Sequence, residues 1–73
     1  LYVQAGAYSH FDNANKARAR LLSTGPAKIS SVLINGRDLF RVRVGPIDNV
    51  KEADNILNSV IIHGYPTARI IVE

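Results

Sequence analysis

The pattern of apolar and polar positions along the chain predicts four strands. Apolar and polar residues alternate over 1–5 and again over 39–44, as they do in strands that bury one face. Two further apolar segments, 28–34 and 68–72, are also predicted to be strands, although serines interrupt the first of them. Asn35-Gly36 lies between the second and third strands, and because both residues tolerate positive φ, we expect a tight hairpin there.

Two helices are predicted between the strands, because apolar residues recur there three and four positions apart. The first is expected to run from an N-cap at Ser9 or Asp12 to about Ser23. The second is expected to begin after an N-cap at Asp48 or Asn49 and to end at a glycine that proline soon follows. The predicted buried stripes are Ala14, Ala17 and Leu21 in the first helix and Ala53, Ile56, Leu57, Val60 and Ile61 in the second.

The pattern occurs twice, with an offset of 39 residues and no gap. The residues shared by the two halves are Val3, Gly6, Ala14 and Gly25 in the first and Val42, Gly45, Ala53 and Gly64 in the second. The repeat indicates a pseudo-twofold α+β fold of order β-α-β-β-α-β, the ferredoxin-like arrangement. Right-handed connections would give a four-stranded antiparallel sheet with both helices on one face and the first and third strands in the centre. Gly6, at the end of the first strand, indicates either a β-bulge or a close approach of the backbone there.

Length and composition limit the class of protein. With 73 residues, the chain is predicted to form a single domain, 1–73, cut from a longer protein, because it begins and ends in strands. There is no cysteine, which excludes disulfides and thiolate metal sites. No apolar run approaches the roughly 20 residues that a membrane-spanning helix needs. The net charge of +3 is mild and is more typical of a solvated surface than of a polyanion-binding protein.

Candidate binding residues are expected on the sheet face that the helices leave open. Alternation assigns to this face Tyr2, Gln4, Leu39, Arg41, Arg43 and Arg69. Gln4 offers a donor and an acceptor, which suits a sugar hydroxyl or an amide, and the arginines offer planar sets of donors. Tyr2 or Leu39 could contact a sugar ring. The alternative is that Arg41 and Arg43 are surface arginines opposite acids, although no acidic residue is expected on this face.

Catalytic chemistry is not indicated, and no metal or cofactor is expected. His10 and His63 are predicted to lie far apart, and His63 suits the negative end of a helix. The carboxylates are assigned to caps, the hairpin, a helix surface and the terminus, and phosphate-binding glycine motifs are missing. The RNA-recognition fold has the same element order. However, residues 39–46 lack the spacing of its aromatic motif, and Phe40 is expected to face the helices.

The segments Tyr2–Ser9 (YVQAGAYS) and Leu39–Ile47 (LFRVRVGPI) resemble the SPOR domain, the sporulation-related repeat of bacterial cell-division and envelope proteins. The resemblance covers nearly the whole chain. It implies a non-catalytic module that binds peptidoglycan glycan strands without stem peptides, here called denuded glycan. It also implies a location in the periplasm or cell envelope, at the division septum. A monomer without a nucleic-acid partner or membrane insertion is expected, and single-stranded RNA or polyanion binding is the alternative function.

The resemblance also implies individual contacts on the open face. The family's glutamine corresponds to Gln4, its third-strand arginine to Arg41, and the large residue two positions earlier to Leu39. Relatives carry a small polar residue where this chain has Ala7, so that contact is expected to move to Ser9 or Asn13. Tyr8 is also predicted to contact the glycan, although its position suits core packing. The predicted glycan-binding residues are Gln4, Tyr8, Ser9, Asn13, Leu39, Arg41, Arg43 and Arg69.

Overall fold

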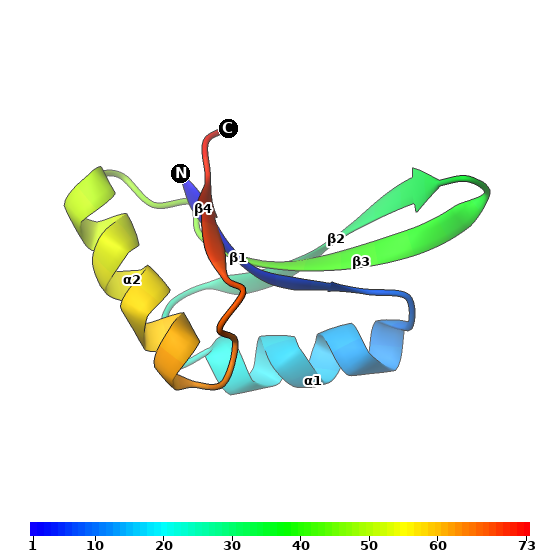
Figure 1. Cartoon of the computed structure of the whole chain (residues 1–73), viewed down its shortest axis with the longest axis horizontal. Coiled ribbons are helices and arrows are strands. Elements are labelled where there is room, and N and C mark those ends of the chain that lie inside the picture. The colour runs from blue at the N-terminus through cyan, green and yellow to red at the C-terminus, as the bar shows by residue number, and fades with distance from the viewer.

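The computed structural model describes all 73 residues and has the predicted order of strands and helices (Figure 1). The strands are β1 (Tyr2–Tyr8), β2 (Ala27–Ile34), β3 (Arg37–Val44) and β4 (Arg69–Ile71), and the helices are α1 (Phe11–Leu21) and α2 (Val50–Ile62). The four strands form one sheet in the order β2-β3-β1-β4, and every neighbouring pair is antiparallel. The predicted α+β fold is therefore confirmed, with β1 and β3 in the centre of the sheet.

The core lies between the sheet and the two helices. Val3, Val42 and Val44 from the central strands have no exposed surface. The helices contribute Ala14, Ala17, Leu21, Ala53 and Val60. Because most of these helix residues are alanines, both helices approach the sheet closely. Burial of each larger Val or Leu side chain stabilises the folded state by roughly 1.5–3 kcal/mol. The predicted stripes are thus confirmed except at the edge of α2, where Ile61 is 39% exposed.

The two helices begin in different ways. Asn49 caps α2, and its Oδ1 accepts a hydrogen bond from the Glu52 backbone N–H at 2.8 Å. The prediction that Ser9 or Asp12 caps α1 is wrong, since its N-cap is His10 and no side chain makes a capping hydrogen bond. The reason is that β1 continues to Tyr8 and the helix begins at Phe11, between the starts that a Ser9 cap and an Asp12 cap would give.

A bulge interrupts β1, as Gly6 predicted. Gln4 pairs with Arg43, but Gly6 pairs with Val42, so Ala5 has no partner of its own in the ladder. Beyond the bulge, Tyr8 pairs with Phe40 on the helix side of the sheet. A Cβ atom at position 6 would lie 3.2 Å from the hydroxyl of Tyr8. Glycine at position 6 therefore makes room for the tyrosine ring that folds back over it.

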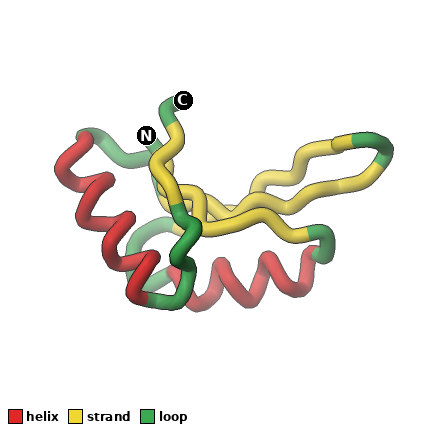
Figure 2. Tube along the Cα trace, viewed as in Figure 1, coloured by secondary structure: helices red, strands yellow, loops and turns green.

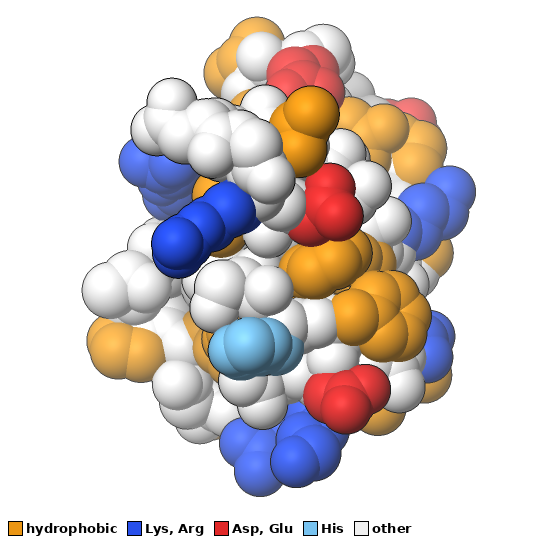
Figure 3. Space-filling view, turned by 90° about the vertical axis from the view of Figure 1, so that its right-hand side faces the viewer, with side chains coloured by type: hydrophobic (Ala, Val, Ile, Leu, Met, Phe, Trp, Pro, Cys, Tyr) orange, Lys and Arg blue, Asp and Glu red, His pale blue; other side chains and the backbone are white.

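β2 and β3 form a long hairpin that projects beyond the helices (Figure 2). Asn35 and Gly36 have φ values of 52° and 75°, as the predicted tight turn requires. The projection leaves Leu33 and Ile34 near its tip 70% and 48% exposed. Viewed from the hairpin side of the molecule, hydrophobic side chains form several separate patches among charged ones (Figure 3). The hairpin thus extends the open face of the sheet past the helix layer.

Candidate glycan-binding face of the sheet

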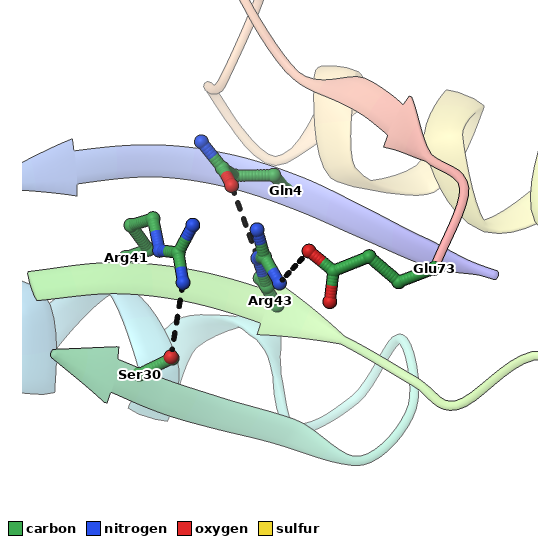
Figure 4. A network of polar contacts seen from close by, with 5 residues as sticks. All are labelled: Gln4, Ser30, Arg41, Arg43 and Glu73. Carbon is green, nitrogen blue, oxygen red and sulfur yellow. Dashed lines mark hydrogen bonds and ion pairs between the residues drawn. The ribbon is translucent and has the colours of Figure 1, made fainter. Parts of the chain in front are cut away.

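Polar side chains from neighbouring strands meet at the centre of the open face (Figure 4). Gln4 on β1 lies directly opposite Arg43 on β3, and opposite Arg69 on β4. Arg41 lies two residues before Arg43 on the same face of β3, and its partner on β2 is Ser30. The ladder therefore sets three arginines around one glutamine.

Gln4 and Arg43 form a buried pair. The Nε–H of Arg43 donates to Oε1 of Gln4 at 3.1 Å, and each residue is only 9% exposed. Because the amide oxygen is used by Arg43, the amide nitrogen points away from it and makes no hydrogen bond within the protein (Figure 4). Arg43 therefore orients Gln4 so that two N–H donors are available to a ligand.

Arg43 has a second partner that was not predicted. Its Nη1 donates to Oε1 of Glu73 at 3.0 Å, and its guanidinium lies 5.9 Å from the ring centre of Tyr2. The expectation that no acidic residue reaches the open face is therefore wrong. The reason is that β4 runs antiparallel to β1 beside Tyr2, so the residues after Ile71 pass near Arg43. The positive charge of Arg43 is balanced inside the domain.

Arg41 has no such balance. Its only hydrogen bond is from Nη2 to Oγ of Ser30, at 3.3 Å, and its buried Nε–H has no partner. The ion pair of Arg43 with Glu73 is the only salt bridge in the structure, so Arg41 carries an uncompensated charge. Ala7 lies directly opposite Arg41 on β1 and is exposed. Because that side chain is a single methyl group, the space beside the guanidinium is open to a ligand.

The structure places the eight predicted site residues in two regions. Gln4, Leu39, Arg41, Arg43 and Arg69 share the open face, where Leu39 pairs with Val32 and adds an apolar border. The other three predicted residues, Tyr8, Ser9 and Asn13, are not on this face. Tyr8 and Asn13 line a pocket on the helix side, and Ser9 lies exposed in the turn between β1 and α1.

Two residues of the network were missed by sequence reasoning. Ser30 could have been found, because the Asn35-Gly36 turn sets the hairpin register and so places Ser30 opposite Arg41. Glu73 follows the last strand, so strand alternation does not indicate which residue it contacts.

Tyr8 lies on the other side of the sheet, and burial raises its pKa above the ordinary value of 10.0. No cluster of three or more His, Cys, Asp or Glu side chains is present, and none of the helices is long and apolar enough to cross a membrane. His63 forms the C-cap of α2, as its position predicted, and its Nδ1 lies 2.7 Å from the carbonyl oxygen of Ser59. The chemistry of the open face therefore rests on hydrogen bonds and on the guanidiniums of Arg41 and Arg69, neither of which has an acidic partner.

A four-stranded antiparallel sheet with its two helices on one side and its other side open defines a small α+β domain. The chain belongs to the SPOR domain family, whose model matches residues 1–68. The predicted membership is thus confirmed, and with it the character of the domain as a binding module without catalytic function of its own.

Curated relatives include the endolytic peptidoglycan transglycosylase RlpA of two Pseudomonas aeruginosa strains, UCBPP-PA14 and PAO1. Each is 38% identical over 71 residues, which cover 92% of this chain and 21% of the relative. The chain therefore spans about a fifth of the length of these relatives.

Two solved structures have the same fold. The crystal structure of the RlpA SPOR domain from Pseudomonas aeruginosa is 32% identical with a TM-score of 0.91, and the match covers 100% of this chain and 99% of that one. The solution structure of the C-terminal RNP domain from the divisome protein FtsN is 29% identical with a TM-score of 0.62, covering 99% and 90%.

Proposed function

We propose that this domain binds denuded peptidoglycan strands on its open sheet face and thereby directs a longer protein to the bacterial division septum. The observation that carries the proposal is the guanidinium of Arg41, which has no acidic partner, beside the free amide nitrogen of Gln4. Membership of the SPOR family supports it, as do relatives named for peptidoglycan cleavage and for the divisome.

The chemistry of the ligand explains a preference for denuded strands. Each muramic acid residue carries a lactyl group, which becomes a free carboxylate once the stem peptide has been removed. The guanidinium of Arg41 can bind that carboxylate through charge-assisted hydrogen bonds. When the stem peptide is attached, the same carbon forms a neutral amide, so the charge that Arg41 would neutralise is missing. Arg41 therefore distinguishes the two forms of the strand.

The rest of the face suits the neutral parts of the glycan. The amide nitrogen of Gln4 can donate to an acetamide carbonyl or to a sugar hydroxyl. Leu39, with Val32 beside it, offers an apolar surface for the face of a sugar ring. Arg69 is exposed across β1 from these residues and adds a further donor. Because the face continues along the hairpin, it can accommodate more than one sugar.

The wider assignments follow from the same argument. Residues 1–73 act as one domain of a longer envelope protein, and the domain works as a monomer without a cofactor. Binding of single-stranded RNA is disfavoured, because Phe40 lies on the helix side of the sheet. Its ring packs edge-on against the ring of Phe11, with 5.7 Å between the ring centres. An RNA-recognition sheet stacks bases on aromatic rings of both central strands, whereas here the open face has the ring of Tyr2 on β1 and none on β3.

Co-sedimentation with purified peptidoglycan sacculi tests the proposal. Sacculi treated with an amidase that removes stem peptides should retain more of the domain than untreated sacculi do. Replacing Arg41 by Gln should abolish this difference, because the carboxylate then has no cation. Arg37→Gln is a matched control, since Arg37 lies on the same face of the same strand but near the hairpin tip. Equal binding to treated and untreated sacculi would overturn the proposed specificity.

A further inference from the structure

A pocket of about 280 Å³ lies on the helix side of the sheet, away from the glycan-binding face. It is formed by the end of β1, one side of α1 and the segment that leads into β4. Its lining residues are Tyr8, Asn13, Lys16, Ala17, Arg20 and Tyr65. The volume lies near the lower end of the range for small-molecule sites, so it suits one compact chemical group rather than a chain of sugars.

The pocket concentrates positive charge without a counterion. Lys16 and Arg20 are four residues apart on α1, so their side chains lie on the same side of the helix. Neither residue forms a salt bridge, and no acidic side chain lines the pocket. Arg18 is on the same helix but does not line the pocket. Its Nε and Nη2 donate to Oδ1 of Asn15 at 3.2 and 3.0 Å, so its guanidinium already has a partner. Two like charges at this spacing repel each other, and an anion between them would remove the repulsion.

Neutral hydrogen-bond donors complete the lining. The ring of Tyr8 is half-buried and folds back over Gly6, which keeps its hydroxyl beside the core. Burial raises the pKa of this hydroxyl, and Tyr65 raises it further, while Arg20 lowers it. The hydroxyl therefore keeps its proton near neutral pH and can donate it to a ligand. Asn13 adds amide N–H groups to the lining.

We propose that this pocket is a second binding site, which takes an oxyanionic group such as a carboxylate or a phosphate ester. Lys16 and Arg20 would neutralise the charge, and Tyr8 and Asn13 would donate hydrogen bonds to the oxygens. The sheet separates the pocket from Arg41, so the two sites can be occupied at the same time. The inference does not depend on glycan binding, because none of the lining residues lies on the open face.

The test is a titration of the isolated domain followed by NMR. Inorganic phosphate and acetate are added separately at constant ionic strength, with chloride as the control anion. We expect saturable shifts in the signals of Tyr8, Lys16 and Arg20 and little change at Gln4. Arg20→Gln should weaken binding about tenfold, because a charge-assisted hydrogen bond is lost. Lys16→Gln should have a similar effect, whereas Arg18→Gln removes the same charge outside the pocket and should change affinity less than twofold.

The results identify the kind of anion that the pocket binds and decide whether the pocket is a binding site at all. Tighter binding of phosphate would indicate a phosphate ester as the natural group, and tighter binding of acetate would indicate a carboxylate. Circular dichroism of each variant shows whether it is folded, and Lys16→Gln replaces Arg20→Gln if the latter is not. Shifts that are absent, that do not saturate, or that respond equally to Arg18→Gln and Arg20→Gln would overturn the second site. Absence of glycan binding on the open face would leave the second site unaffected.

Discussion

Arg43 donates a hydrogen bond to Gln4 across 39 residues of sequence, which is also the offset of the internal repeat. The two residues therefore occupy equivalent positions in the two halves and lie face to face in the β1–β3 ladder. In a perfectly repeated chain, two identical side chains would meet at this point. Two arginines would repel each other there, while two glutamines would carry no charge. Divergence at one pair of equivalent positions thus produced a donor and an acceptor that fit each other.

Gln4→Glu separates the two roles of this residue. The glutamate keeps an oxygen acceptor for Arg43, so we expect the melting temperature to stay within a few degrees. Glycan binding should fall about tenfold or more, because the amide donors are lost and the new charge repels the lactyl carboxylate. Calorimetric titration with a denuded glycan tetrasaccharide measures the affinity.

Gln4→Leu is the matched comparison, because it removes the acceptor altogether. Arg43 would then hold a buried Nε–H without a partner, which costs about 1–3 kcal/mol of unfolding free energy. Equal stability of the Leu and Glu variants would show that the buried hydrogen bond does not orient the pair.

Glu73→Gln should strengthen glycan binding. The carboxylate of Glu73 accepts from Nη1 of Arg43 at 3.0 Å, and its removal frees the Arg43 guanidinium for the ligand. We expect the affinity for denuded glycan to rise severalfold, and the gain to shrink at high salt because screening weakens exposed charge pairs. The loss of stability should stay below about 1 kcal/mol, since Glu73 is more than half exposed. Asp54→Asn, on the exposed side of α2, changes net charge equally and should leave binding unaltered.

Asn49→Ala should destabilise the domain by about 1 kcal/mol, because it removes the side chain that caps α2. For a domain of this size, that loss lowers the melting temperature by roughly 4–8 °C. Asp48→Ala serves as the control and should have a much smaller effect, since Asp48 is exposed and makes no capping hydrogen bond. Thermal unfolding followed by circular dichroism measures both. A larger effect at position 48 would contradict the assigned cap.

Because the pKa of Tyr8 is raised in the folded state, we expect the domain to lose stability in alkaline solution. Burial and Tyr65 hold the pKa of Tyr8 above 10.0 in the folded state, while Arg20 acts in the opposite direction. As the pH rises through 10, the unfolded chain therefore loses this proton before the folded one does, and the free energy of unfolding falls. Urea denaturation at pH 8 and pH 10.5 should show this fall in the natural domain. The fall should be smaller in Tyr8→Phe, which has no ionisable group there, and an identical fall in both would contradict the prediction.

Much of the fold could be predicted because its periodicities are simple. The strict alternation of β3 and the helical spacing of α2 each have one interpretation, and Asn35-Gly36 has the φ values that its turn needs. The internal repeat then extends these assignments to the first half, where Ala14 and Ala17 alone are a weak signal for a helix.

The site could be predicted only as far as strand alternation is regular. Alternation assigns Gln4 correctly because it precedes the bulge in β1, and it assigns Arg41 and Arg43 correctly because β3 itself is uninterrupted. The partners of these residues depend on tertiary structure. Glu73 reaches Arg43 only because β4 pairs with β1, and the difference between a balanced Arg43 and an unbalanced Arg41 cannot be derived from two arginines spaced two apart.

Ala5, the residue of β1 without a partner in the ladder, has an effect on every residue that follows it in the strand. In an uninterrupted ladder, Tyr8 would lie opposite Leu39, with its ring on the same face as Gln4 and Arg41. That face would then carry a second aromatic ring in addition to Tyr2, together with the arginines, and such rings and cations stack and neutralise single-stranded nucleic acid. The unpaired residue reverses the orientation and directs the ring to the helix side instead. In this fold, the number of aromatic rings on the open face thus depends on whether one strand carries an unpaired residue.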